Sequence, residues 1–174
     1  MSRLLAEALV RDIPDFPRPG ILFKDITPVL ADYAAMRQAL DVMKEHAQTL
    51  SPDLVLGIEA RGFIFGAPLA LELGVGFAPL RKLGKLPHHR ITEEYELEYG
   101  TNQVELHADA APAGSRVLIV DDLLATGGTA AAAVRLVERL DASVAGLMFL
   151  IELEFLNGRE RLGSHTVHSL IRYR

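Results

Sequence analysis

The residues best suited to chemistry are two adjacent carboxylates, Asp121 and Asp122, followed by a turn of small residues at 126–129. The turn reads Thr-Gly-Gly-Thr, so it offers backbone N–H groups and two hydroxyls without a bulky side chain to cover them. Amides at the start of a helix bind phosphate, because they lack partners and the helix dipole favours negative charge. We therefore expect a phosphate cradle here, with the carboxylates about one sugar's width away, where they would hold ribose hydroxyls.

Two elements would position this turn. The apolar run 117–120 (Val-Leu-Ile-Val) is typical of a buried parallel strand, and it ends at Asp121. A helix is expected at 130–140, because four apolar residues share one of its faces: Ala133, Val134, Val137 and Leu140. Acids and glycines can also merely punctuate a strand-to-helix turn, with Thr129 as the N-cap. The tandem acids directly before the cradle favour the binding role.

Two competing phosphate motifs are excluded. A Walker A loop needs Gly-Lys followed by Ser or Thr, whereas Gly84-Lys85 is followed by Leu86. The G-x-G formed by Gly74 and Gly76 lacks the third glycine and precedes an apolar run, so it is not a dinucleotide fingerprint.

The composition indicates one soluble domain. A chain of 174 residues is long enough to bury a sizeable core, and its 49% hydrophobic and 24% charged residues are ordinary for a globular protein. A net charge of −5 without a basic block argues against nucleic acid as a partner. The chain has no cysteine, no signal-peptide core and no membrane-spanning run, which together predict a cytoplasmic protein.

Apolar runs alternating with helical stripes predict an α/β fold with a doubly wound, mainly parallel sheet. The further strands are expected at 54–58, 76–80, 144–151 and 166–171. The further helices are expected at 4–10, at 32–50, and from the end of the segment 59–62 to about Leu73. Alternation on both sides of Gly100 predicts a hairpin of 95–99 with 103–107. The segment 13–28 is apolar but carries four prolines, so we expect an irregular flap that packs over something.

The run 117–129 resembles the 5-phosphoribosyl 1-diphosphate (PRPP) signature of type I phosphoribosyltransferases, in the form D-D-L-L-A-T-G-G-T found in adenine phosphoribosyltransferases. Further stretches resemble the hood segment of that family (17–28, P-R-P-G-I-L-F-K-D-I-T-P) and its pyrophosphate loop (60–63, A-R-G-F). R-K-L-G-K-L-P at 81–87 and L-E-Y-G at 97–100 are similar to the start and end of its mobile catalytic loop. The resemblance implies one domain over 1–174, with the N-terminal helix and hood at 1–31 and the loop at 81–100.

The resemblance also implies roles for individual residues. The 5′-phosphate would lie on Ala125, Thr126, Gly127, Gly128 and Thr129. The diphosphate would meet the cations Arg61, Arg81, Lys82 and Lys85. Adenine would stack on Phe23 and meet the backbone of Leu22, with Lys24 beside it. The catalytic residues would be Glu98, which exchanges a proton with the base, together with Asp121, Asp122 and Arg61.

The activity implied is Mg²⁺-dependent transfer of the phosphoribosyl group from PRPP to N9 of adenine, giving AMP and diphosphate in purine salvage. Mg²⁺ would be held mainly through PRPP, since the sequence offers no dedicated metal cage, and the family is typically dimeric. A phosphoribosyltransferase for another base and a non-enzymatic PRPP-binding regulator stay open as alternatives. Taken singly, three kinds of residue have simpler interpretations: Phe23 as core, Glu98 as a solvated hairpin face, and Lys82 and Lys85 as surface cations.

Overall fold

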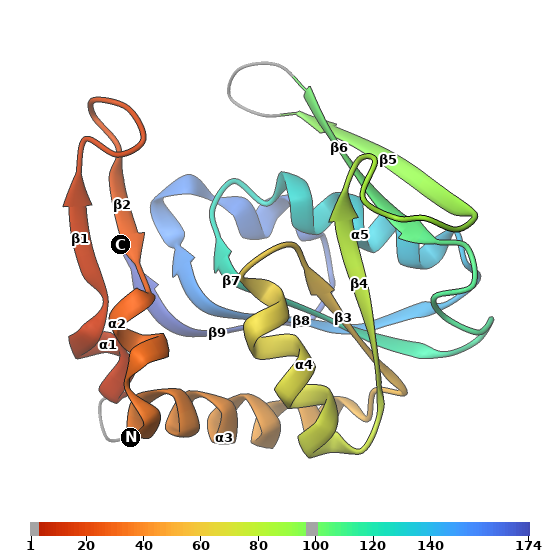
Figure 1. The fold of residues 1–174 in the computed structure, drawn as a ribbon, viewed down its shortest axis with the longest axis horizontal. Coiled ribbons are helices and arrows are strands. Elements are labelled where there is room, and N and C mark those ends of the chain that lie inside the picture. The colour runs from red at the N-terminus through yellow and green to blue at the C-terminus, as the bar shows by residue number, and fades with distance from the viewer. Residues whose placement is uncertain (1–3, 97–100) are drawn as a thin grey trace. The chain divides into compact units, whose positions relative to one another are not determined.

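The computed structural model describes residues 4–96 and 101–174, and the chain divides into two compact units, Met1–Val42 and Met43–Arg174. The division falls inside the long helix α3 (Tyr33–Leu50). The presence of α3 confirms the helix expected at 32–50. Figure 1 shows the order of the elements along the chain. No helix in the two described ranges is long and apolar enough to cross a membrane.

Unit 1 contains a two-stranded hairpin between short helices. Helix α1 (Leu5–Leu9) is followed by β1 (Arg11–Pro14), β2 (Leu22–Asp25) and α2 (Thr27–Ala31), and the two strands pair antiparallel. The expectation of wholly irregular structure at 13–28 was therefore wrong. The prolines are tolerated because Pro14 is the last residue of β1, while Pro17 and Pro19 lie in the connection.

Unit 2 is built on a seven-stranded sheet in the order β5-β6-β4-β3-β7-β8-β9. The five strands from β4 to β9 in that order are parallel, and they are β4 (Gly76–Lys82), β3 (Leu54–Ile58), β7 (Arg116–Leu124), β8 (Ser143–Leu153) and β9 (Val167–Tyr173). Strands β5 (Arg90–Glu96) and β6 (Thr101–His107) form an antiparallel hairpin at one edge. This confirms the α/β, mainly parallel sheet.

Helices cover both faces of this sheet. In β7, Val117 and Ile119 belong to the apolar cluster that includes the buried face of α5 (Gly128–Glu138). Side chains alternate along a strand, so the neighbouring residues of β7 face the other way. Helix α4 (Gly62–Leu73) packs on that other face. Gly57 of β3 lies beside Val120 of β7, and a Cβ on Gly66 of α4 would be only 3.4 Å from the Cα of Gly57. The sheet is therefore doubly wound, as Figure 1 also shows.

The alanine-rich sequence of α5 explains how that helix seats on the sheet. Ala132, Ala133 and Leu136 are fully buried, and they pack in the same cluster as Leu147 and Phe149 of β8. Small side chains let the helix backbone approach the strands closely. Burying each large apolar side chain contributes about 1.5–3 kcal/mol, so the beginning of α5 is held firmly beside the end of β7.

Several strands differ in extent from the sequence prediction, and the differences in β7, β4 and β5 lie nearest the predicted site residues. Strand β7 does not end at Asp121 but continues to Leu124, because β8 pairs with it as far as Leu124 opposite Glu152. Strand β4 extends to Lys82, since Arg81 and Lys82 pair with β6. Strand β5 begins at Arg90, so much of the segment predicted as a loop at 81–100 is strand.

A short 3₁₀ segment follows β8. The turns η1 (Glu154–Leu156) and η2 (Gly158–Leu162) lead from β8 to β9. Arg159 of η2 donates to both carboxylate oxygens of Glu152 at 2.9 and 2.5 Å. The hydrogen bonds from Arg159 lower the pKa of Glu152. This pair ties η2 to β8 and fixes where η2 lies.

Glu105 of β6 is a buried carboxylate that organises the turn after β4. Its Oε1 accepts hydrogen bonds from the backbone N–H groups of Lys85 (2.7 Å) and Leu86 (2.6 Å), and Arg90 lies 2.8 Å from its Oε2. Burial would raise the pKa of Glu105, but the amides of Leu86, Gly84 and Lys85 together with the charge of Arg90 bring that pKa below its usual value. The turn is thus held by a charged group.

Replacing Glu105 with Gln should make the free energy of unfolding less dependent on pH in the acid range. Because the folded pKa of Glu105 lies below its ordinary value of 4.5, its charge stabilises the fold above that pH. That contribution is lost as the pH falls through the folded pKa. Denaturant titrations should therefore show the stability gap between wild type and Glu105→Gln shrinking below pH 4.5. The exposed Glu45→Gln serves as the control, and a pH-independent gap would contradict the account.

Candidate active site at the carboxyl ends of the parallel strands

The segments that follow β3, β4 and β7 carry the predicted charged residues of unit 2, and they start at one edge of the sheet. Strands β3, β4 and β7 are parallel, and their register places Ile58 beside Leu80 and Gly57 beside Val120. The residues that follow these positions therefore emerge at the same edge. In open α/β sheets this is where ligands bind, and the predicted cations and carboxylates of unit 2 follow strands that end at this edge.

Asp122 and Arg61 form the ion pair at the centre of this edge. The Nε of Arg61, the residue that precedes α4, donates a short hydrogen bond to Oδ2 of Asp122. The Asp122 side chain is only 6% exposed, whereas that of Arg61 is 45% exposed. A buried carboxylate thus orients a guanidinium that still reaches solvent, which suits Arg61 to meet an anionic ligand.

Asp121 lies against the start of α4. Its Oδ1 accepts a hydrogen bond from the backbone N–H of Asp122 at 2.8 Å. A Cβ on Gly62 would lie 3.0 Å from that oxygen and 2.6 Å from the carbonyl oxygen of Val120, so only glycine allows α4 to begin this close. Burial, and then the negative charge of Asp122, raise the pKa of Asp121 well above its ordinary value. Asp121 can therefore hold a proton more readily than an ordinary aspartate.

The predicted phosphate cradle is a small cavity at the start of α5. Ten residues line about 80 Å³: Asp121, Leu123, Leu124, Ala125, Thr126, Gly127, Gly128, Thr129, Ala130 and Phe149. Gly127 is the N-cap of α5 with φ of 80°, and no side chain caps the helix there. The first amides of α5 therefore lack a side-chain partner, as a phosphate site requires.

Close contact with η2 fixes the shape of the cradle. A Cβ on Gly127 would collide with the carbonyl oxygen of Gly158, and a Cβ on Gly158 would collide with that of Ala125. Both positions therefore require glycine. Nothing in the sequence around Asn157-Gly158 indicates that this turn packs against the cradle.

Arg81 is already paired with a carboxylate, Glu59, for which the sequence indicated no role. Its Nε donates to Oε2 of Glu59 at 2.9 Å, and the backbone N–H of Lys82 donates to the same oxygen at 2.8 Å. The hydrogen bond from Arg81 is the largest influence on Glu59, and the pKa of Glu59 is lowered. The peptide bond between Glu59 and Ala60 is cis. Glu59 thus joins the ends of β3 and β4, and Arg81 is less available to a ligand than predicted.

Lys82 and Lys85 have solvent-exposed side chains in this region. Both residues are exposed, and within the described part of the chain neither ammonium group makes a hydrogen bond or ion pair. Their backbones are held by Glu59 and Glu105 respectively. Fixed backbones with unengaged side chains suit a site that attracts a highly charged anion.

The predicted adenine-binding residues lie together on β2 of unit 1. The Phe23 ring is half-buried and meets Phe16 edge-on, with ring centroids 5.1 Å apart. Leu22 is 49% exposed. The Nζ of Lys24 lies 2.5 Å from a carboxylate oxygen of Asp12, so the charge of Lys24 is already paired. Phe23 and Leu22 thus keep accessible surface, and Phe23 is not simply core.

The predicted acid–base residue Glu98 lies outside the described residues, as does the rest of 97–100. The strands on both sides are described, and Glu96 pairs with Thr101 at the end of the hairpin. The hairpin prediction is thus confirmed for 103–107, while its first strand begins earlier than expected.

Gly158→Ala should weaken binding of PRPP, the ligand that the resemblance implies, because the new methyl group would displace Ala125 and distort the cradle. Hydrogen bonds to charged groups contribute about 1.5–3 kcal/mol, so losing one should raise KM for PRPP roughly tenfold or more. Steady-state kinetics would measure this. Gly76→Ala is the control, since its methyl would meet only the Leu54 side chain, at 3.1 Å. Equal KM values in the two variants would refute the role of Gly158.

Comparison with known proteins identifies the family. A family model described as "Phosphoribosyl transferase domain" matches residues 29–163. The adenine phosphoribosyltransferase of Thermobifida fusca is 57% identical over 166 residues, which span 95% of this chain and 94% of the relative. The Nitrosococcus oceani enzyme of the same name is 57% identical over 173 residues, 99% of this chain and 100% of the relative.

Solved structures agree with this match. The adenine phosphoribosyltransferase of Thermoanaerobacter pseudethanolicus has a TM-score of 0.94 at 52% identity, covering 97% of this chain and 98% of that one. The Saccharomyces cerevisiae enzyme, solved with D-2,5-dideoxy-2,5-imino-altritol 1,6-bisphosphate and adenine, has a TM-score of 0.91 at 44% identity, covering 95% and 96%. Signature, site and near-complete coverage together place the chain in the adenine phosphoribosyltransferase family.

Proposed function

We propose that this chain transfers the 5-phosphoribosyl group of PRPP to N9 of adenine, forming AMP and diphosphate in purine salvage. The observation that carries the proposal is the course of β7, which passes through Asp121 and Asp122 directly into the cradle at the start of α5. The yeast relative, solved with adenine and a sugar bisphosphate analogue, supports this choice of substrates.

In the reaction the bond from ribose C1 to the diphosphate oxygen breaks, and a bond from C1 to N9 of adenine forms. The ribose gains oxocarbenium character as the diphosphate leaves. The cradle amides hold the 5′-phosphate and so fix the sugar. Asp121 and Asp122 hold the ribose hydroxyls, and the charge on this pair offsets the developing positive charge.

The leaving diphosphate is stabilised by cations of the same edge. Arg61, oriented by Asp122, meets it together with the open side chains of Lys82 and Lys85. Arg81 contributes mainly by holding Glu59, and through it the end of β3, in place. This arrangement neutralises charge at the leaving group while leaving the ribose face to the carboxylates.

Adenine recognition is assigned to β2 and proton transfer to Glu98. Phe23 would stack on the base, and the backbone of Leu22 would read its edge. Lys24 would contribute indirectly, because its ion pair with Asp12 of β1 stabilises the pairing of β1 with β2. Glu98 would exchange a proton with the base as N9 forms its new bond.

Mg²⁺ enters this proposal as an ion carried by PRPP. Within 4–96 and 101–174, no group of three or more His, Asp or Glu side chains could hold a metal. Oxygen ligands are what Mg²⁺ prefers, and it commonly binds through one or two carboxylates plus substrate phosphates. Asp121 and Asp122 fit that role beside the sugar hydroxyls and diphosphate. When bound, the ion would neutralise charge on the leaving diphosphate.

A homodimer and a cytoplasmic location complete the proposal. Helix α4 leaves Ile64 40% and Leu71 82% exposed, and residues seven apart lie on one helix face. A second copy would cover this apolar face, and sedimentation equilibrium distinguishes such a dimer from a monomer. The absence of cysteine from the sequence supports a reducing compartment.

The test of the function is AMP formation from adenine and PRPP, measured with and without Mg²⁺. Hypoxanthine, guanine and orotate are offered in parallel and as competitors. We expect AMP with adenine, strong dependence on Mg²⁺, and little product with the other bases. Preference for another base would replace adenine in the proposal. PRPP binding without turnover of any base would indicate a PRPP-binding regulator instead.

Glu98→Gln should lower kcat strongly while leaving PRPP affinity nearly unchanged. General acid–base catalysis typically contributes ~10²–10⁴-fold, whereas a solvated hairpin glutamate would change almost nothing. Single-turnover AMP formation is the measurement, because it reports chemistry even when a later step limits turnover. An unchanged single-turnover rate would remove Glu98 from the mechanism.

A further inference from the structure

Glu93 is an acidic residue in an inward-facing row. In β5, Ile91, Glu93 and Tyr95 alternate with more exposed neighbours, so these three share one face of the strand. Tyr95 is part of the apolar cluster beside α5, and Ile91 packs against that cluster. The alternation of the strand predicts an apolar residue between Ile91 and Tyr95. The residue there is Glu93, whose side chain is only 21% exposed.

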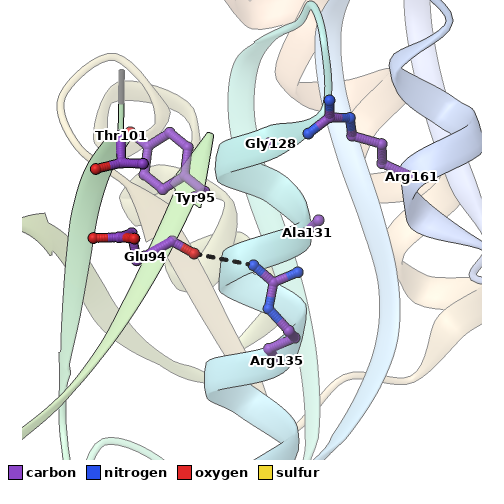
Figure 2. Close-up of a pocket in the computed structure, with 7 residues that line it drawn as sticks. All are labelled: Glu94, Tyr95, Thr101, Gly128, Ala131, Arg135 and Arg161. Atoms are coloured by element: carbon purple, nitrogen blue, oxygen red, sulfur yellow. Dashed lines mark hydrogen bonds between the residues drawn. The ribbon is translucent and has the colours of Figure 1, made fainter. Parts of the chain in front are cut away.

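Two arginines hold Glu93, Arg135 of α5 and Arg139, the residue that caps the carboxyl end of α5. The Nε of Arg135 donates to its Oε1 at 2.6 Å, and the Nη1 of Arg139 donates to its Oε2 at 3.1 Å. The same arginines also bond the strand backbone: Arg135 the carbonyl of Glu94 at 3.3 Å (Figure 2) and Arg139 that of Thr92 at 2.6 Å. We call Glu93, Arg135 and Arg139 the clamp.

The sheet itself holds the hairpin only weakly. Strand β5 pairs only with β6 among the described strands. Strand β6 pairs with β4 at Arg81–Glu105 and Lys82–Val104, and the backbone N–H of Leu83 donates to the carbonyl of Gln103 at 3.3 Å. The outer ends of the hairpin, at Glu96 and Thr101, lie beyond that ladder. Contacts with α5 therefore act directly on the part of the hairpin that lies beyond its attachment to β4.

One clamp residue, Arg135, lines a cavity that lies between the hairpin and the cradle. About 560 Å³ of space is lined by Tyr95 and Thr101 from the hairpin ends, Gly128 from the cradle, and Arg161 from η2 (Figure 2). Glu94, Ala131 and Arg135 complete the wall. One helix, α5, thus presents the cradle at its start and grips β5 further along.

We propose that Glu93 is a positioning residue: through Arg135 and Arg139 it fixes the ends of the hairpin relative to the phosphate cradle. The catalytic consequence rests on the proposed function, in which the cradle holds the 5′-phosphate and the strands lead into the segment with Glu98. The clamp side chains are between 21% and 48% exposed, so their ion pairs add little to stability. The clamp instead fixes the position of the hairpin ends relative to the cradle, and a change in that position would lower kcat.

Glu93→Gln keeps the size of the side chain and removes its charge. We expect kcat for AMP formation to fall roughly ten- to a hundredfold, since small misplacements of reacting groups have effects of that order. KM for PRPP and for adenine should stay within about twofold, because the cradle is intact. Adding Arg139→Gln to Glu93→Gln should lower kcat by less than the product of the two single effects, since both changes break the same ion pair and only the bond from Arg139 to the Thr92 carbonyl is lost in addition.

Glu72→Gln is the matched control. Glu72 of α4 pairs with Lys44 of α3 at 2.8 Å, and both side chains are about a third exposed. It should lower the melting temperature as much as Glu93→Gln does but leave kcat unchanged. If Glu93→Gln keeps kcat within twofold of wild type, or if Glu72→Gln loses as much, the positioning role is overturned.

Hydrogen exchange gives a readout that does not need turnover. In Glu93→Gln, amides of β5 and β6 should exchange faster while those of β3 and β7 do not change. If the wild type makes no AMP, the proposed function fails by itself. The clamp is then judged on exchange alone, and unchanged exchange in the hairpin would overturn it.

Discussion

The close contact between Gly127 and Gly158 is the constraint on which the site depends. Because neither position has room for a Cβ, η2 presses against the loop after β7 and sets the course of Ala125–Thr129. Gly127 then starts α5 with a positive φ and no side-chain cap. Backbone amides left in this way are an anion site before any cationic side chain is added.

The rest of the active edge is arranged around that cradle by carboxylates that hold cations. Asp122 orients Arg61, and Glu59 holds Arg81 and the backbone of Lys82. Each carboxylate engages a cation or its backbone where two strand ends meet, so the charges are set before a ligand arrives. Such preorganisation removes reorganisation from the reaction itself.

Local features of the sequence predicted much of the fold and the core of the site. Asp121 through Thr129 could be recognised because strand, acids and cradle are contiguous, and the parallel sheet followed from periodicity. Glu59, Gly158 and the clamp could not, since their partners are distant in the chain. Glu105 shows the limit most clearly: alternation puts it on the polar side of β6, but the turn after β4 folds over it and buries it.

The central claim is that the α5 cradle holds the 5′-phosphate while the β7 carboxylates face the ribose. A crystal structure of the protein with AMP tests it most directly. The account predicts the phosphate within hydrogen-bond distance of the amides of Thr126 to Thr129, with the ribose hydroxyls on Asp121 and Asp122. A phosphate bound instead between Arg135 and Arg161, in the cavity beside the hairpin, would contradict it.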